Sequence, residues 1–395
     1  MASQVGKRRP RMTAATAFDL VRAAIAEKGR ITFAEFMEIA LYAPGAGYYT
    51  AAPHLRGENS DPTARHSGGS RNPEIALQTG PPHDYYTAPH LHAVFGAYIA
   101  RHVAQVWRDL GEPQHFDVVE MGAGRGILAW DILRSLRETA PRCWERTRYR
   151  MIDRGAGPSA EQQEALVAVA AHPIITAQSL TEPVLGMVLS NELLDALPAH
   201  RVRVKNGKLQ ELYVTAQGER LCEVYGDPSC PELTDYVERL GRPPEGWQGE
   251  VCLAAVAWLE SVARALTKGT VLTIDYGATW AELCSARWVE GTLACYFRHR
   301  VSRDPFARVG AQDITAHVNF SALVNYGEAV GLSTVSMQAQ AEYLVGLGIG
   351  EELAALAHQP PTAETQRAKR AITDLIWPDG LGGFRVLVQE KCTGR

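Results

Sequence analysis

Short apolar segments alternate with amphipathic helical segments through the middle of the chain. Strands are predicted over 116–121, 148–152, 174–177, 187–190 and 270–275, and helices over 91–110, 128–137, 161–169 and 251–268. The last of these helices is expected to end at Gly269. A helix over 321–330 and strands over 332–337 and 384–389 should complete the sheet. This alternation is typical of a parallel sheet wrapped by helices, so the predicted fold class is α/β and Rossmann-like.

The N-terminal part of the chain has a helical pattern of its own. A first helix is predicted over 14–27, and the capping box Thr32-Phe33-Ala34-Glu35 predicts a second. We expect a flexible tail over 1–13 and an N-terminal helical cap over 14–86, with a mobile loop over 51–84 that is rich in Gly, Pro, Ser, Asn and His. The Rossmann-like domain is expected over 87–395. It should carry an insertion of about 201–250, a β-hairpin/helical subdomain whose hairpin turns at Asn206-Gly207.

Composition excludes several classes of protein. With 46% hydrophobic and 21% charged residues the chain can bury a core, and its net charge of −4 argues against a nucleic-acid partner. No apolar run reaches the roughly 18–20 residues of a membrane span. Seven scattered Cys indicate neither a disulfide framework nor a zinc site, so we expect a cytoplasmic protein and a reaction without a metal.

The most informative motif is the glycine turn that follows the strand over 116–121. A dinucleotide site would place its third glycine at Ile127, whereas this chain has the spacing Glu-x-Gly-x-Gly-x-Gly. Enzymes that use S-adenosylmethionine (SAM) have this form. SAM has no pyrophosphate, and its ammonium group needs carboxylate and carbonyl acceptors near the turn. We therefore expect a SAM site rather than a ligand-free turn, formed by Glu120, Gly122, Ala123, Gly124 and Gly126.

Acids at the ends of the following strands supply the remaining candidates. Asp153 follows the second strand, where a carboxylate can bind the ribose hydroxyls, although an Asp in this position can also be a turn former. Gln178, Ser179 and Leu180 follow the third strand and are expected to flank the adenine.

The fourth strand ends in Asn191-Glu192-Leu193-Leu194-Asp195-Ala196-Leu197-Pro198. Open α/β sheets build their sites at the carboxyl ends of strands. Glu192 and Asp195, three positions apart, are expected to share one face of a helical turn and to orient a cationic or hydroxyl acceptor. Solvated acids at a capped helix start are the alternative.

Several longer motifs resemble those of the MidA family of SAM-dependent methyltransferases, whose mitochondrial members assist respiratory complex I assembly. They run in family order from about residue 30 to Gly382-Gly383-Phe384, nearly the whole chain. Besides the glycine turn and the 191–198 motif, they are Leu41-Tyr42-x-Pro44-x-x-Gly47-Tyr48-Tyr49, Thr87-Ala88-Pro89, Ile274-Asp275-Tyr276-Gly277, Arg298-His299-Arg300 and Asp313-Ile314-Thr315-Ala316-His317.

The resemblance implies a class I SAM-dependent methyltransferase fold and, for its mitochondrial members, methylation of arginine on a partner protein. Carried over by position, Thr87 and Pro89 would line the SAM pocket, and Asn191 would face the methyl group beside Glu192 and Asp195. The chain departs from the family pattern at His90 and at Arg154-Gly155-Ala156-Gly157-Pro158, and the segment between Tyr49 and Thr87 is longer than usual.

The leading hypothesis is a methyltransferase that acts on an arginine of a partner protein and releases S-adenosyl-L-homocysteine. Glu192 and Asp195 would hold the guanidinium and take up its proton, with Asn191, His317, His299 and Tyr276 as further orienting or base candidates. A small-molecule O- or N-methyltransferase and a non-catalytic assembly factor are the alternatives. The sequence leaves open the acceptor, the number of methyl groups transferred, the role of 51–84 and a homodimer.

Overall fold

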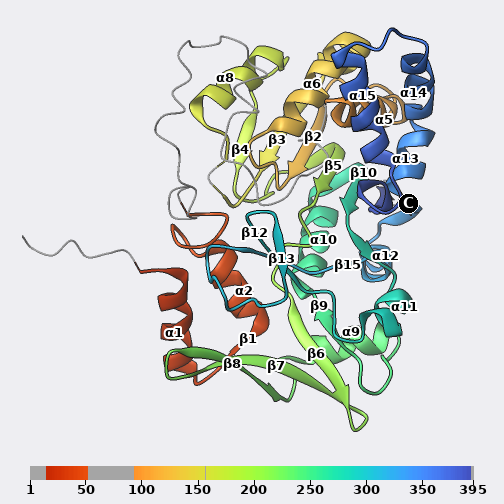
Figure 1. The fold of residues 1–395 in the computed structure, drawn as a ribbon. Coiled ribbons are helices and arrows are strands. Elements are labelled where there is room, and N and C mark those ends of the chain that lie inside the picture. The colour runs from red at the N-terminus through yellow and green to blue at the C-terminus, as the bar shows by residue number, and fades with distance from the viewer. Residues whose placement is uncertain (1–14, 52–92, 156, 393–395) are drawn as a thin grey trace, which may run out of the picture.

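The computed structural model describes residues 15–51, 93–155 and 157–392. Its largest unit is a seven-stranded sheet whose strands lie in the order β16-β17-β10-β5-β2-β3-β4 (Figure 1). Only β17 runs antiparallel to its neighbours β10 and β16; the pairs from β10 to β4 are parallel. The strands are β2 (Phe116–Met121), β3 (Thr147–Ile152), β4 (Ile175–Ala177), β5 (Val184–Asn191), β10 (Leu266–Asp275), β16 (Ser333–Ala339) and β17 (Arg385–Lys391). The predicted α/β sheet is confirmed.

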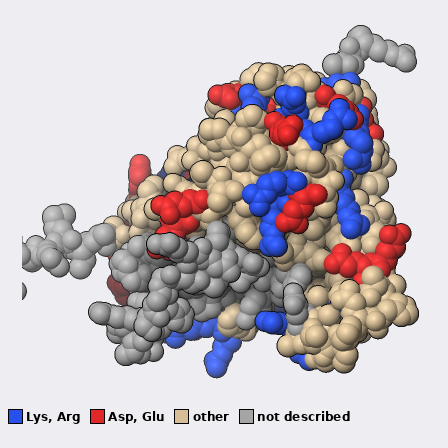
Figure 2. Space-filling model, turned by 90° about the horizontal axis from the view of Figure 1, so that it is seen from above, with Lys and Arg blue, Asp and Glu red and all other residues tan. Residues whose placement is uncertain are grey.

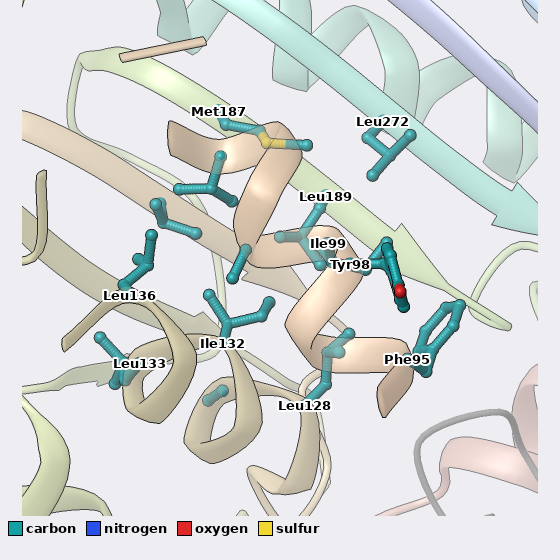
Figure 3. Close-up of a cluster of buried hydrophobic side chains, with 14 of the residues drawn as sticks. Phe95, Tyr98, Ile99, Leu128, Ile132, Leu133, Leu136, Met187, Leu189 and Leu272 are labelled. Atoms are coloured by element: carbon teal, nitrogen blue, oxygen red, sulfur yellow. The ribbon is translucent and has the colours of Figure 1, made fainter. Parts of the chain in front are cut away.

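Helices cover both faces of this sheet because successive strand residues point to opposite sides. On one face, Val118 and Leu272 pack under α5, α6 and the C-terminal helices; Figure 3 shows part of this cluster. On the other face, Val119 and Val271 pack under α10 and α12. The helices around the sheet are α5 (Val94–Asp109), α6 (Ile127–Thr139), α7 (Pro141–Trp144), α8 (Ala160–Val169), α10 (Leu253–Ala265), α12 (Phe320–Ala329), α13 (Gln340–Gly346), α14 (Ile349–Ala357) and α15 (Ala363–Ile376).

A second sheet lies beside the first and joins distant parts of the chain. Its strand order is β1-β7-β6-β9, and β8 also pairs with β7. The turn at Asn206-Gly207 connects β6 to β7 with φ values of 53° and 68°, which confirms the predicted type I′ hairpin. The strands are β1 (Ile31–Thr32), β6 (His200–Lys205), β7 (Lys208–Gln217), β8 (Arg220–Gly226) and β9 (Gln248–Val251).

The N-terminal helices α1 (Ala17–Lys28) and α2 (Phe33–Tyr42) pack on this second sheet. Thr32 caps α2 with the predicted capping box, since Glu35 N donates to its hydroxyl and Thr32 N donates to Glu35. The remaining elements are α9 (Pro231–Leu240), β11 (Gly277–Ala278), α11 (Trp280–Leu283), a 3-10 turn (Ala286–Trp288), β12 (Ala294–Phe297), β13 (Arg300–Ser302), β14 (Asp313–Thr315), β15 (Val318–Asn319) and a second 3-10 turn (Leu381–Gly383).

The predicted end of the helix over 251–268 is wrong. Gly269 does not end a helix: α10 stops at Ala265, and Gly269 lies inside β10 with φ 136°. A Cβ on Gly269 would lie 1.8 Å from the carbonyl oxygen of Gly186 in the neighbouring strand. The glycine therefore allows the close approach of β10 and β5.

Candidate functional site

The predicted glycine turn lies at the carboxyl end of β2. Gly122, Gly124 and Gly126 have φ values of 75°, 52° and 81°, which favour glycine, and α6 begins at the next residue. A Cβ on Gly122 would meet Leu193 at 2.9 Å, and one on Gly126 would meet Leu166 at 2.8 Å. A Cβ on Gly124 would have no described atom within 4 Å. The outer glycines thus allow close packing of the protein, while the middle one faces open space.

Asp153 joins the end of β3 to this turn. Its Oδ2 accepts a 2.8 Å hydrogen bond from Gly124 N, and its Oδ1 accepts one of 2.6 Å from Gly155 N. The Gly122 amide also donates to the carbonyl of Ile152 at 2.8 Å. The structure therefore brings the glycine motif and the predicted ribose ligand into direct contact.

The other candidates around the turn differ in exposure. Gln178 and Ser179 are exposed just after β4, and Leu180 packs against the core on the α10 face of the sheet. Ala123 is buried. Thr87, Pro89 and the loop over 51–84 lie outside the described residues, apart from Ala51.

Glu120 lies beneath the turn rather than on its open side. Its side chain is buried, and Oε2 accepts a 2.8 Å hydrogen bond from the Tyr149 hydroxyl. Burial, together with the charges of Asp153 and Asp131, raises the pKa of Glu120 to about 8, although the Tyr149 hydrogen bond lowers it. Its predicted contact with the cofactor stays a prediction.

The ends of β5 and β10 form a buried acidic centre. Asp275, the last residue of β10, accepts hydrogen bonds from the amides of Leu194 (2.9 Å) and Asp195 (3.4 Å) with Oδ2, and from Tyr276 N (2.9 Å) with Oδ1. Asp195 is 3% exposed, and its Oδ1 has no hydrogen-bond partner among the described residues. Burial, together with the charge of Asp313, raises the pKa of Asp195 to about 7. Burial and the charge of Asp195 likewise raise the pKa of Asp275.

This arrangement corrects the predicted geometry of Glu192 and Asp195. Residues 192–199 contain no helix, and Glu192 has a left-handed φ of 52°. The two acids therefore do not share a helical face, and the amides of Leu194 and Asp195 donate to the Asp275 carboxylate. Asn191 and Glu192 are in contact, since Asn191 Nδ2 donates to Glu192 Oε1 at 3.1 Å.

Tyrosines and a third aspartate surround the acidic centre. The Tyr276 hydroxyl lies close enough to Asp195 for that acid to raise the pKa of Tyr276, although the two form no hydrogen bond of good geometry. The Tyr49 hydroxyl donates to Asp313 Oδ1 at 2.8 Å. Burial raises the pKa of Tyr296, and the charges of Asp195, Asp313 and Glu192 also raise it.

Sequence reasoning assigned no role to Asp275, Asp313, Tyr49 or Tyr296. Three of them lie inside motifs that the sequence singled out, at 274–277, 313–317 and 47–49. Asp275 could have been found, because it ends a strand of the parallel sheet and such ends build sites. Only the tertiary fold brings Tyr49 to Asp313, 264 residues further along the chain.

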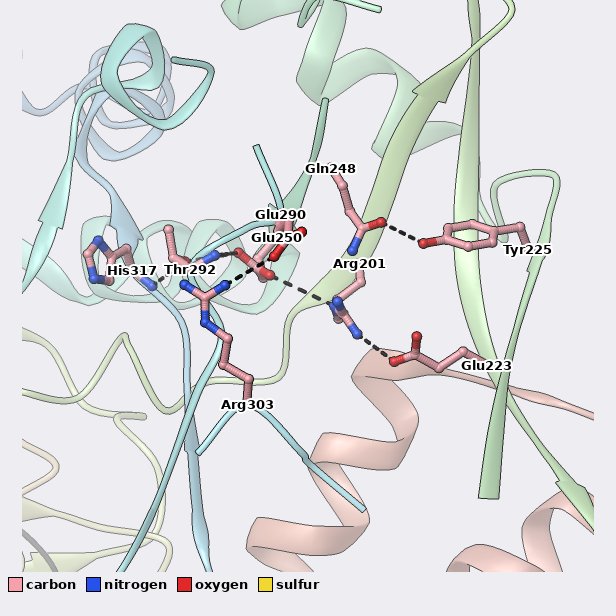
Figure 4. A network of polar contacts seen from close by, with 9 residues as sticks. All are labelled: Arg201, Glu223, Tyr225, Gln248, Glu250, Glu290, Thr292, Arg303 and His317. Atoms are coloured by element: carbon pink, nitrogen blue, oxygen red, sulfur yellow. Dashed lines mark hydrogen bonds and ion pairs between the residues drawn. The ribbon is translucent and has the colours of Figure 1, made fainter. Parts of the chain in front are cut away.

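His317 is brought to the same region and is held there by a polar network (Figure 4). Its backbone amide donates to Thr292 Oγ1 at 2.9 Å, and Thr292 donates through N and Oγ1 to Glu250 Oε2 at 2.8 and 2.9 Å. The His317 ring lies 5.4 Å from that of Tyr276, and burial lowers its pKa to about 4, with a further contribution from Arg287. His317 is therefore neutral at pH 7. His299 is exposed in the turn between β12 and β13.

Comparisons with known proteins decide the family. Residues 98–338 match the model of the family described as "Putative S-adenosyl-L-methionine-dependent methyltransferase". The chain belongs to this family. A solved structure from Burkholderia thailandensis, described as a "likely methyl transferase" and bound to S-adenosyl-homocysteine, is 31% identical, with a TM-score of 0.77 over 95% of this chain and 92% of that one.

Curated relatives agree with this assignment. The mitochondrial protein arginine methyltransferase NDUFAF7 homolog of Drosophila melanogaster is 25% identical over 79% of this chain and 70% of its own length. The human protein arginine methyltransferase NDUFAF7, also mitochondrial, is 26% identical over 84% of this chain and 73% of its own length. The predicted class I methyltransferase fold and the use of SAM as methyl donor are confirmed.

The residues of this methyltransferase fit a bound SAM molecule. The open space at Gly124 allows a ligand to approach the backbone of the turn. The Asp153 carboxylate lies directly beside it, and the Oδ1 atom of Asn191 at the end of β5 is buried without a hydrogen-bond partner among the described residues. These groups could bind hydroxyl and ammonium donors.

Within 15–51, 93–155 and 157–392, no helix is long and apolar enough to cross a membrane. In the same ranges no three His, Cys, Asp or Glu side chains gather in a way that could hold a metal ion.

Proposed function

We propose that the protein methylates an arginine side chain of a partner protein. The observation that carries this proposal is the buried acidic centre beside the glycine turn. No Lys or Arg of the described residues forms an ion pair with Asp195 or Asp275. Buried carboxylates are costly unless a positive charge or hydrogen bonds compensate them. A cationic acceptor would supply the charge, and a guanidinium suits two carboxylates through its fork of N–H donors.

The names of the curated relatives support the same acceptor class. Both the Drosophila melanogaster and the human relative are called protein arginine methyltransferases, and the chain matches each over most of its length. A small neutral metabolite is a poorer match, because it would bring no positive charge to Asp195, whose Oδ1 atom has no hydrogen-bond partner among the described residues.

In this proposal the glycine turn and the neighbouring strand ends bind the cofactor. Bound SAM supplies a methyl group carried on a positively charged sulfur. Asp153 binds the ribose hydroxyls, and Gln178, Ser179 and Leu180 flank the adenine. The residues assigned to the turn are Gly122, Ala123, Gly124 and Gly126, with Glu120 beneath them.

The acceptor-side residues orient the guanidinium and manage its proton. An arginine has a pKa above ~12, so a nitrogen must lose a proton when it is methylated. Asp195 is the proton acceptor in this proposal, because an acid with a pKa near 7 is well matched to that role at neutral pH. Asn191, Glu192 and Tyr276 orient the acceptor, and neutral His317 lines the same region.

Transfer of label tests the proposal directly. The protein is incubated with SAM labelled in its methyl group and either a cell lysate or a small-metabolite extract. We expect label in a protein band and, after acid hydrolysis, in methylated arginine. Label confined to the low-mass fraction, or to another amino acid, would overturn the arginine proposal. Asp195→Asn provides the inactive control, and Asp379→Asn, an exposed acid, the active one.

A further inference from the structure

The N-terminal cap contributes a tyrosine to the acidic centre. Tyr49 lies a few residues after α2, and its hydroxyl donates to Asp313 Oδ1, which also accepts the amide of Ile314 at 2.9 Å. Tyr42, the last residue of α2, stacks on Tyr49 with a ring separation of 5.4 Å and donates to the carbonyl of Ala196 at 3.0 Å. The two tyrosines therefore connect β14 to the loop that carries Asp195.

Tyr49 also contacts the cofactor side of the site. A Cβ on Gly155 would lie 3.2 Å from the Tyr49 carbonyl oxygen, and Gly155 N donates to Asp153. Arg154, between them in sequence, lies over the ring of Tyr42 at 4.3 Å and pairs with Glu38 of α2. The cap thus spans the distance from the candidate ribose ligand to Asp313.

Asp313 lies near Asp195, since the amide of Ala316, just after β14, donates to the Asp195 carbonyl oxygen at 2.9 Å. It is fully buried, it comes from β14 rather than from the seven-stranded sheet, and its charge acts on both Asp195 and Tyr296. Asp275, Asp195 and Asp313 therefore bring three carboxyl groups close together, with Tyr49 and Tyr276 beside them. Aromatic rings with carboxylates are the surroundings in which a guanidinium is held by stacking and by charge together.

We propose that Asp313 binds the cationic side chain of the acceptor and that Tyr49 is the positioning residue that aims it. The inference rests on the proposed function, and it adds a specificity determinant from outside the Rossmann-like sheet. These carboxyl groups would select a guanidinium over a neutral side chain of the same shape, and the cap would be part of that selection.

Binding of a small probe tests the inference apart from methyl transfer. The protein is saturated with S-adenosyl-homocysteine and titrated in a calorimeter with N-acetyl-arginine methylamide, or with its neutral isostere N-acetyl-citrulline methylamide. We expect the wild type to bind the arginine probe more tightly. Asp313→Asn should weaken that binding by about tenfold or more, the range for a hydrogen bond to a charged group, without changing the citrulline affinity. Tyr49→Phe should also reduce the preference for the arginine probe over the citrulline probe, by a smaller factor.

Matched controls separate this role from general damage to the fold. Asp117→Asn removes a buried aspartate at the opposite end of β2, where it pairs with Arg148. Tyr225→Phe removes a hydroxyl that donates to Gln248 in the second sheet. Both should keep the preference for arginine. If Asp313→Asn does not fold, the probe preference of Tyr49→Phe alone tests the inference.

Equal binding of the two probes by the wild type would overturn the inference. So would an unchanged preference in both Asp313→Asn and Tyr49→Phe. Failure of the proposed function has a different signature: the probe still discriminates, but no protein receives label from SAM.

Discussion

The Gly124 amide donates a 2.8 Å hydrogen bond to the Asp153 carboxylate, so two motifs 29 residues apart meet at one point. The bond fixes the ends of β2 and β3 relative to each other before any ligand binds. An acid held in this way needs little rearrangement to accept hydroxyl groups, and a site organised in advance loses less entropy on binding.

Replacing Gly124 by Val should abolish cofactor binding. The residue has φ 52°, so a β-branched side chain is strained there by about 1–2 kcal/mol, and the side chain would occupy the open space in front of the turn. We expect at least a tenfold loss of affinity for S-adenosyl-homocysteine by calorimetry. Gly207→Val is the matched control, since Gly207 also has a positive φ, of 68°, and open space around its Cβ position. It should lose similar stability and no affinity; unchanged affinity in Gly124→Val would contradict the assignment.

Transfer should depend on pH through Asp195. The charged form accepts the proton, so kcat/KM should fall as the pH drops below about 7, the pKa of this acid. Asp275, Asp313, Glu192 and Tyr276 face the same space, and a bound cation should move the midpoint for kcat lower, because it favours the charged acids. Asp195→Asn should reduce kcat by about 10²-fold or more and remove this limb of the profile, with cofactor affinity unchanged. A flat profile between pH 5.5 and 8 in the wild type would exclude this role.

Glu192→Gln should keep cofactor binding and lose transfer. The carboxylate is half-buried beside Asn191, and Gln retains its shape but not its charge. A loss of about tenfold or more in kcat/KM is expected if the charge orients a cation. Single-turnover assays with labelled SAM would measure it, with the exposed Glu164→Gln as control. A normal rate in Glu192→Gln would show that Glu192 is structural.

Glu120 should make the protein less stable as the pH rises. Its pKa is about 8 in the folded state against 4.5 in the unfolded chain, so between these values the folded protein binds more protons. The free energy of unfolding then falls with pH by up to about 1.4 kcal/mol per unit from this group. Urea unfolding of wild type and Glu120→Gln at pH 5.5 and 8 would measure the difference. The variant should show a shallower decline, and an equal decline would mean that Glu120 is charged throughout.

The sequence predicted the elements that depend on local pattern. The strand over 116–121 has the predicted bounds, the capping box at Thr32 is present, and Asn206-Gly207 forms the predicted hairpin turn. These features follow from alternation, capping and turn chemistry within a few residues. Asp153 follows β3 as predicted, and its contact with the glycine turn, which was not predicted, follows from the parallel pairing of β2 and β3.

What the sequence did not predict depends on partners far along the chain. Glu192 and Asp195 have helical spacing, but Glu192 has a left-handed φ of 52°, and the loop after it is held by the carboxylate of Asp275, some 80 residues later. Gly269 has the position of a helix stop, yet its role is set by Gly186 in another strand. The contact between Tyr49 and Asp313 has no local signal at all.

The pairing of β1 with β7 limits where the N-terminal part of this enzyme can be truncated. Ile31 lies opposite Val214, so a strand from the start of the chain completes the edge of a sheet that is otherwise built by the middle of the chain. The N-terminal segment and the second sheet are therefore not separate modules. Removal of the first 32 residues would take away the strand that pairs with Tyr213 and Val214, and it would expose the apolar surface beneath α1. A shortened enzyme that begins at the Rossmann-like sheet should therefore lose its acceptor side as well as its leading helices, even if the cofactor half still folds.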